Sequence, residues 1–277
     1  MTTTMLPGMK FSPPDDKAEV RLVTKGRSSW YEVDGVKHQR VTTVLNKAIP
    51  KPALVPWARN EALASVRAAM VSNREQFMAG GESPESYMDW VESTIAKARA
   101  RPDAIKDEAA DWGTRAHACI STMLREGTQD GVTPEFQPAV DGFLAWQAQQ
   151  NITVLDVERT VWDRGMQVAG TCDGVGLDPE GNLVVWDNKT GKAIYPEMAL
   201  QVAAYSAMLC NLALMPRWGR RAWILRLPHL PPGAGEPVLE AREVQGVWEC
   251  WVLFQAAHQL GIGLDGPIWK DQAKKEA

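Results

Sequence analysis

The pattern of apolar residues changes near residue 152, and this change restricts the folds that the chain can adopt. Before that point apolar side chains recur at the spacing of an amphipathic helix, and after it alternating or β-branched runs predict strands. We therefore predict an α/β or α+β fold with a helical N-terminal half. The helical ranges are 54–71, 84–100, 102–126 and 134–150. The later ranges are strands at 152–162, 166–177, 183–186, 221–227 and 237–244, with helices at 196–211 and 245–260.

A smaller element precedes the first long helix. Residues 18–24 and 29–33 predict short strands, the Asp34-Gly35 pair suits a hairpin turn, and a helix is expected at 41–48. The whole chain then divides into four predicted segments. These are a flexible tail (1–17), a hairpin with a helical cap (18–104), a core domain (105–265) and a C-terminal tail (266–277).

The charge balance excludes a protein that is coated in positive charge, because 30 Lys and Arg face 34 Asp and Glu, for a net charge of −4. The first 60 residues nevertheless hold ten basic and five acidic residues, a surplus of +5, which leaves −9 for the remainder. Such an asymmetry is compatible with one part of the chain holding a polyanion while acidic groups elsewhere hold metal.

The four cysteines, Cys119, Cys172, Cys210 and Cys250, include no CxxC pair, so neither a zinc ribbon nor a disulfide framework is expected. The uncharged stretch 198–215 contains polar residues and is interpreted as a buried helix, so we expect no membrane contact. We see no signal peptide at the N-terminus and expect a cytoplasmic protein.

Two carboxylates and a lysine form the most informative pattern. Asp187 and Lys189 lie two apart on a predicted strand end and therefore leave the same face of the strand. Asp173 lies on the preceding strand, and pairing of the two strands around the turn at 178–182 would bring it opposite Asp187. A divalent cation would relieve the repulsion between the carboxylates, and the lysine could act on a water or a phosphate oxygen. The trio therefore suits metal-assisted phosphodiester hydrolysis.

Four motifs in order resemble those of a known family. G-T-x-x-H, G-x-x-D, (D/E)-x-K-T and Q-x-x-x-Y are the motifs of the PD-(D/E)XK nuclease superfamily, and within it of the RecB-like exonuclease branch. The resemblance covers roughly residues 105–260, and Arg40-Val41-Thr42-Thr43-Val44-Leu45 is similar to the V-T-T-x-L entry of phage-encoded members. The four matching segments are Gly113-Thr114-Arg115-Ala116-His117, Gly170-Thr171-Cys172-Asp173, Asp187-Asn188-Lys189-Thr190 and Gln201-Val202-Ala203-Ala204-Tyr205.

The resemblance implies a restriction-endonuclease-like core, in which helices flank a central mixed sheet, and a set of site residues. His117, Asp173, Asp187 and the backbone carbonyl of Asn188 would bind Mg²⁺ or Mn²⁺. Lys189 would activate or position the attacking water. The remaining implied roles are those of Glu158 (a second metal or its water shell), of Gln201 and Tyr205 (holding phosphates or orienting Lys189), and of Thr190 and Lys192 (substrate contact).

The same residues also have structural interpretations. Asp173 could be a turn or strand-end aspartate, and Asp187-Asn188-Lys189 a solvated strand terminus. His117 could be a helix histidine with its hydrogen bonds satisfied, Glu158 an outward strand residue, and Tyr205 a core residue with a solvated hydroxyl. The iron–sulfur relatives of the branch use one upstream cysteine and a close set of three, a spacing that the cysteines here do not match, so we expect no cluster. No GxxxxGK[ST] motif occurs, so any unwinding would need a partner.

We therefore expect a metal-dependent DNA exonuclease that acts in phage recombination, repair or replication, in the host cytoplasm. Its partners would be single-stranded DNA or duplex ends, with a recombinase or a single-strand-binding protein as a further candidate. A structure-specific or restriction-like endonuclease on the same site stays open. So do a catalytically silent module that binds DNA or a recombinase, and a metal phosphoesterase for small nucleotides.

Overall fold

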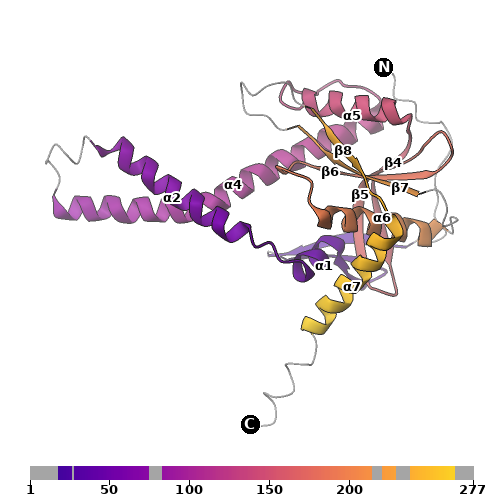
Figure 1. Cartoon of the computed structure of the whole chain (residues 1–277), viewed down its shortest axis with the longest axis horizontal. Coiled ribbons are helices and arrows are strands. Elements are labelled where there is room, and N and C mark those ends of the chain that lie inside the picture. The colour runs from indigo at the N-terminus through magenta and orange to yellow at the C-terminus, as the bar shows by residue number, and fades with distance from the viewer. Residues whose placement is uncertain (1–17, 27, 75–82, 214–219, 229–237, 266–277) are drawn as a thin grey trace, which may run out of the picture. The chain divides into compact units, whose positions relative to one another are not determined.

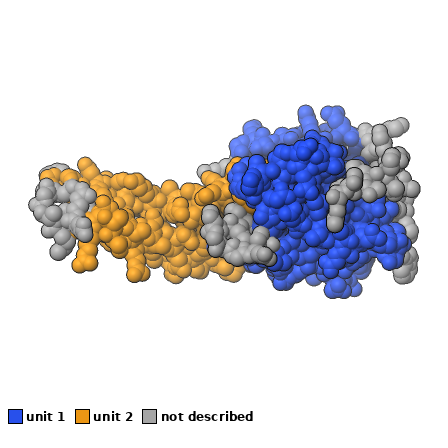
Figure 2. Space-filling model, turned by 90° about the horizontal axis from the view of Figure 1, so that it is seen from above, with its two compact units in different colours: residues 1–49, 115–277 blue, residues 50–114 orange. Residues whose placement is uncertain are grey.

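The computed structural model describes residues 18–265 apart from residues 27, 75–82, 214–219 and 229–237. The chain divides into two compact units (Figure 2). One unit contains residues 1–49 and 115–277, and the other contains residues 50–114. Residues 18–49, which the sequence grouped with the helical cap, therefore belong to the same unit as the core.

The larger unit is built on a mixed sheet of eight strands within the described residues (Figure 1). Its order is β1-β2-β3-β5-β6-β7-β8, and β4 pairs with β5 outside this path. The pairs β3–β5 and β6–β7 are parallel, whereas the other pairs are antiparallel. The mixed sheet that we expected is thus confirmed. The strands are β1 (Val20–Lys25), β2 (Ser28–Val33), β3 (Val36–Arg40), β4 (Thr153–Asp163), β5 (Val168–Leu177), β6 (Leu183–Lys189), β7 (Arg220–Arg226) and β8 (Glu240–Glu243).

Two strands, β3 and β6, pair with different parts of the same edge of strand β5. Its other edge pairs with β4 along the whole strand. On the shared edge, β3 pairs only with Val168 and Ala169, and β6 pairs only with residues 174–177. Residues 170–173 lie between these two ladders, so the G-x-x-D motif sits where neighbouring strands separate. A split of this kind leaves side chains room to converge from strands and helices.

Helices cover both faces of the sheet (Figure 1). Successive strand residues point to opposite faces of the sheet. On one face, Val185 of β6 packs in the main core with residues of α6 (Pro196–Ala213), α7 (Val247–Asp265) and α1 (Val41–Ala48). Trp186 points the other way and meets α5 (Gln137–Gln150), where its ring lies 5.9 Å from that of Phe143 and 5.8 Å from that of Trp146. The continuous apolar run of β6 thus reflects burial on both faces.

The smaller unit contains α2 (Leu54–Ser72) and the first part of α4 (Pro84–Glu126). We predicted two helices at 84–100 and 102–126, and this prediction is wrong, because α4 continues through Pro102. A proline inside a helix removes one backbone hydrogen bond. The buried positions Thr94, Ala98 and Pro102 follow one another at four-residue spacing, so one helix face continues across the proline. Helix α2 has no buried residue. None of the described helices combines the length and the apolar character that crossing a membrane requires.

Candidate active site

The two carboxylates lie where strands β5 and β6 separate. The last pair of their ladder is Gly174 with Trp186, so Asp173 and Asp187 are the next opposite positions. The Oδ2 atom of Asp173 accepts a hydrogen bond from the backbone N–H of Asn188. The structure thus brings the two aspartates together across the turn that the sequence indicated. The turn itself is held by Asp178, whose Oδ1 accepts a hydrogen bond of 2.8 Å from the backbone N–H of Asn182.

Lys189 and helix α6 complete this side of the site. The Nζ atom of Lys189 forms an ion pair with Oδ2 of buried Asp187 and donates a 3.0 Å hydrogen bond to Oε1 of Gln201. The amide nitrogen of Gln201 donates to Oδ1 of Asp187 over 3.3 Å and to the hydroxyl of Tyr205 over 2.9 Å. Gln201 and Tyr205 share a helix face because they are four residues apart. One amide therefore fixes the lysine, the aspartate and the tyrosine relative to one another.

Steric crowding explains why two positions of this region, Gly170 and Gly174, are glycines. A Cβ atom on Gly170 would lie 2.4 Å from Cε1 of Tyr205, and a Cβ on Gly174 would lie 1.9 Å from the Trp186 ring. Both distances are far below a van der Waals contact, so neither position has room for a side chain. The glycine of the G-x-x-D motif therefore makes space for the tyrosine of the Q-x-x-x-Y motif.

His117 and Glu158 approach the aspartates from α4 and β4. Nδ1 of His117 lies 3.0 Å from Oδ1 of Asp173. Glu158 lies between the β4–β5 pairs Val157–Gly174 and Arg159–Cys172, so it is opposite Asp173 in the register. Its Oε1 lies 2.7 Å from the hydroxyl of Ser121, one turn after His117 on α4. We did not single out Ser121 from the sequence, although its i+4 spacing from His117 was visible there.

Two of the expected substrate residues lie outside this network. Thr190 is half-buried and Lys192 is exposed, on the segment between β6 and α6. Among the described residues, neither is a hydrogen-bond or ion-pair partner of Asp187, Lys189 or Gln201. Their assignment as substrate contacts stays a prediction.

Burial and neighbouring charges change the acidity of the site. Burial raises the pKa of Asp187 to about 6 and the charge of Asp173 adds to this, while Lys189 opposes the rise. Burial lowers the pKa of His117, but its hydrogen bond with Asp173 and the charges of Asp173 and Asp187 outweigh burial, so the pKa is raised. Burial also raises the pKa of Cys172 well above its usual value. Its thiol donates a 3.4 Å hydrogen bond to the Arg159 carbonyl, so Cys172 is a core residue.

The chemistry of the donors suits a hard divalent cation. Asp173 and Asp187 offer carboxylate oxygens and His117 an imidazole nitrogen, and Mg²⁺ and Mn²⁺ accept such ligands. Oδ2 of Asp187 is buried and makes no hydrogen bond, only its ion pair with Lys189, so this atom can take a further cation. Within the described residues no three His, Cys, Asp or Glu side chains already stand at metal-ligand spacing. Binding would therefore require His117 and Asp173 to exchange their mutual contact for the cation.

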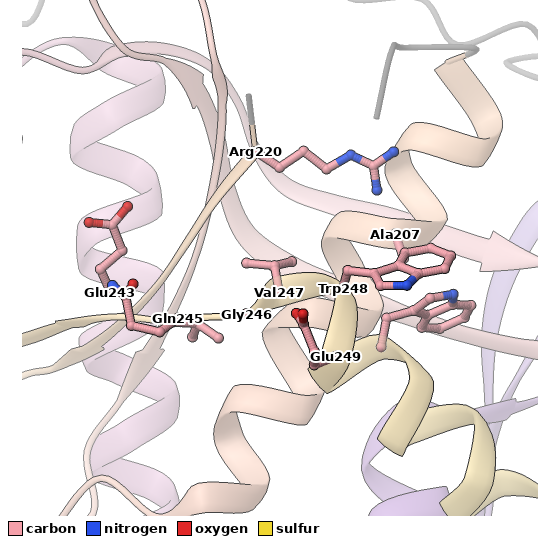
Figure 3. Close-up of a pocket in the computed structure, with 10 residues that line it drawn as sticks. Ala207, Arg220, Glu243, Gln245, Gly246, Val247, Trp248 and Glu249 are labelled. Carbon is pink, nitrogen blue, oxygen red and sulfur yellow. The ribbon is translucent and has the colours of Figure 1, made fainter. Parts of the chain in front are cut away.

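A separate pocket lies away from these residues. It has a volume of about 710 Å³ and is lined by residues that include Arg220, Trp248 and Glu249 (Figure 3). Arg220 pairs with Leu183 at the start of β6, whereas Lys189 ends that strand. Six residues of strand separate the two positions by about 20 Å. The pocket therefore belongs to the other end of the sheet, away from the carboxylates and the lysine.

Comparisons with known proteins identify the family of this chain. A solved structure described as the crystal structure of SSO0001 aligns at 11% identity with a TM-score of 0.29, over 73% of this chain and 95% of that chain. A TM-score this low carries no argument. No curated protein sequence matches the chain. The sequence model of the PD-(D/E)XK nuclease superfamily matches residues 66–260, which is more than half of the chain. The chain that carries this site therefore belongs to the PD-(D/E)XK nuclease superfamily.

Proposed function

We propose that the protein is a metal-dependent DNA exonuclease of the RecB-like branch, acting in phage recombination, repair or replication. Membership of the superfamily implies hydrolysis of phosphodiester bonds with a divalent metal ion such as Mg²⁺. The observation that carries the proposal is the amide of Gln201, which joins Lys189, Asp187 and Tyr205 in one hydrogen-bonded group beside Asp173. A purely structural strand end has no physical reason to hold two adjacent carboxylates, one of them buried, together with a lysine.

Each residue has a defined task in this proposal. Asp173, Asp187 and His117 would hold the cation, with the Asn188 carbonyl as a further ligand, and Glu158 would serve a second metal or its water shell. A bound cation would polarise the phosphoryl group and lower the pKa of a bound water. Thr190 and Lys192 would contact the phosphates of the bound strand.

Lys189 would act on the attacking water or on the negative charge that develops on phosphate oxygens. Its Nζ is fixed by two partners, Asp187 and Gln201, so its ammonium group is already oriented before substrate arrives. Groups that need no reorganisation during the reaction stabilise developing charge most effectively. Gln201 and Tyr205 would therefore act by orienting Lys189.

Asp187→Asn and Lys189→Ala test the site. We expect each to lower the cleavage rate at least a hundredfold, because Asp187 would hold the cation and Lys189 would act on the attacking water or the phosphate charge. Glu180→Gln is the matched control, since Glu180 is an exposed acidic residue in the turn at the far end of the same two strands. The circular dichroism spectrum of each variant shows whether it is folded. Wild-type activity in a folded Asp187→Asn variant would overturn the proposal.

The mode of cleavage needs its own experiment. End-labelled linear DNA, single- and double-stranded, is incubated with Mg²⁺ or Mn²⁺ beside a covalently closed circle. We expect loss of the linear DNA while the circle survives, and the label released first gives the polarity. Cutting of the circle would replace the exonuclease with an endonuclease. Binding of DNA without any cutting would indicate a silent module.

A further inference from the structure

Helix α4 contacts two neighbouring strands through side chains one turn apart. His117 lies 3.0 Å from Asp173 on β5, and Ser121 lies 2.7 Å from Glu158 on β4. Residues four apart on a helix have Cβ atoms about 5–6 Å apart. Opposite residues of paired strands are separated by nearly the same distance, about 4.5–5.5 Å. The spacing of His117 and Ser121 on α4 therefore matches the spacing of Asp173 and Glu158 across the two strands.

Glu158 adopts an unusual backbone conformation at this point. Its φ angle is +56°, in the left-handed region, in the interior of strand β4. For a residue with a side chain, this conformation costs on the order of 1 kcal/mol or more, and it persists only where the surroundings hold it. Glu158 is exposed, so core packing does not hold its side chain, and the hydroxyl of Ser121 is its hydrogen-bond partner.

Glu158 also extends the row of carboxylates. It stands opposite Asp173, which in turn stands opposite Asp187, so three acidic residues follow one another across β4, β5 and β6. Like charges in adjacent positions repel, and a freely rotating Glu158 would turn away from the other two. A hydrogen bond from buried Ser121 prevents this rotation.

We propose that Ser121 is a positioning residue that holds the Glu158 carboxylate beside Asp173 and so sets the acidic row that receives the cation and the scissile phosphate. The proposal rests on the proposed nuclease function and assigns Ser121 no contact with substrate. The Ser121 hydroxyl also lies 2.8 Å from the backbone carbonyl of His117. A hydroxyl has one proton, so the carbonyl and an ionised Glu158 compete for it. The Ser121 hydroxyl therefore connects the helical turn that carries His117 with the carboxylate of Glu158.

A double-mutant cycle separates this role from simple helix packing. The variants are Ser121→Ala, Glu158→Gln and both together, with Ser72→Ala as the control. Ser72 donates the same i−4 bond, 3.0 Å to the Ala68 carbonyl on α2, and its hydrogen-bond partners among the described residues include no carboxylate. We expect Ser121→Ala to lower kcat about tenfold to a hundredfold, the effect of one lost hydrogen bond to a charged group, with KM unchanged. In the Glu158→Gln background the same change should have little effect, and Ser121→Thr should restore the rate.

A second readout does not depend on cleavage. Mn²⁺ alone is titrated into each variant, and the Mn²⁺ concentration that raises the thermal midpoint by the same fixed amount is compared. We expect Ser121→Ala and Glu158→Gln to raise this concentration by the same factor, and the double variant to raise it no further. Additive effects in either cycle, or a Ser121→Ala variant identical to wild type, would overturn the inference. If wild type cuts no DNA, the nuclease proposal fails, and the Mn²⁺ cycle alone still decides the role of Ser121.

Discussion

Gly170 shows at the scale of one residue how the motifs of this chain depend on one another. The Tyr205 ring occupies the space where a Cβ atom of residue 170 would lie, with Cε1 only 2.4 Å away. Any larger residue must displace the ring, and the ring's hydroxyl is the partner of the Gln201 amide. Because that amide also contacts Lys189 and Asp187, a methyl group at position 170 acts on the site through three contacts.

We therefore predict that Gly170→Ala lowers both stability and cleavage. Overpacking of a buried site costs about 1–3 kcal/mol, and the displaced tyrosine should leave Lys189 less well oriented. Urea unfolding measures the first effect and single-turnover cleavage the second. Gly261→Ala is the control, because nothing lies within 4 Å of its added Cβ in helix α7, where alanine should stabilise by up to about 1 kcal/mol. Wild-type stability and rate in Gly170→Ala would contradict the steric account.

At the scale of elements, periodicity and turn residues were enough for most of the fold. Helices α1, α2 and α6 and strands β4 and β5 lie within a few residues of the predicted ranges. The continuity of α4 was missed because a local rule, that proline ends a helix, competes with a buried face that spans residues 94–102. The pairing of β3 with β5 was also out of reach, since 129 residues separate Gln39 from Val168 and no local signal specifies so distant a partner.

Some residues of the candidate site could be predicted from the sequence, whereas Ser121 could not. The residues with a chemical signature, Asp173, Asp187 and Lys189, could be named from spacing, because a two-residue period puts Asp187 and Lys189 on one face. Ser121 carries no such signature. Its relation to Glu158 depends on where α4 crosses the sheet and on the left-handed backbone of Glu158, and both are properties of the folded chain.

A buried histidine of helix α7 leads to a prediction about how the stability of the protein depends on pH. His258 is buried, and burial lowers its pKa below the ordinary 6.5, although Asp163 at the end of β4 opposes this. Since the folded pKa is depressed, the stabilisation from neutral His258 is fully present above pH 6.5. It is lost as the pH falls through the folded value.

We expect wild type to lose more stability between pH 7.5 and pH 5.5 than His258→Gln, which cannot be protonated in this range. Urea midpoints of both proteins at the two pH values test this. Subtracting one protein from the other removes the other titrating groups, including His117, whose raised pKa acts in the opposite direction. Equal losses in the two proteins would show that His258 takes up its proton without disturbing the packing of α7.

At the scale of the whole molecule, the two units differ in how they can be stabilised. Helix α2 of the smaller unit has no fully buried residue, whereas most helical stability in proteins comes from the packing of a buried apolar face. The larger unit contains the sheet, the main core and every residue of the candidate site. A ligand of the site can therefore act directly only on the stability of the larger unit.

This leads to a prediction for metal binding by the full chain. The site holds two carboxylates in close proximity, one of them with a pKa of about 6, and a cation bound to the folded state alone stabilises it by mass action. At a metal concentration 100 times the dissociation constant, the gain is about 2.7 kcal/mol. At roughly 2–4 °C per kcal/mol for a chain of this size, Mn²⁺ should raise the thermal midpoint of the larger unit by about 5–10 °C at pH 7.5.

The measurement is a thermal melt with near-ultraviolet circular dichroism, in EDTA and over a series of Mn²⁺ concentrations. EDTA added after Mn²⁺ should return the midpoint to its metal-free value. Asp187→Asn should abolish the shift, because the amide brings no charge to the cation and leaves Lys189 without its carboxylate partner. Glu180→Gln should retain the full shift, since it removes an exposed charge remote from the site. A shift of the same size in Asp187→Asn would mean that the cation binds elsewhere on the molecule, and the acidic row would then need another function.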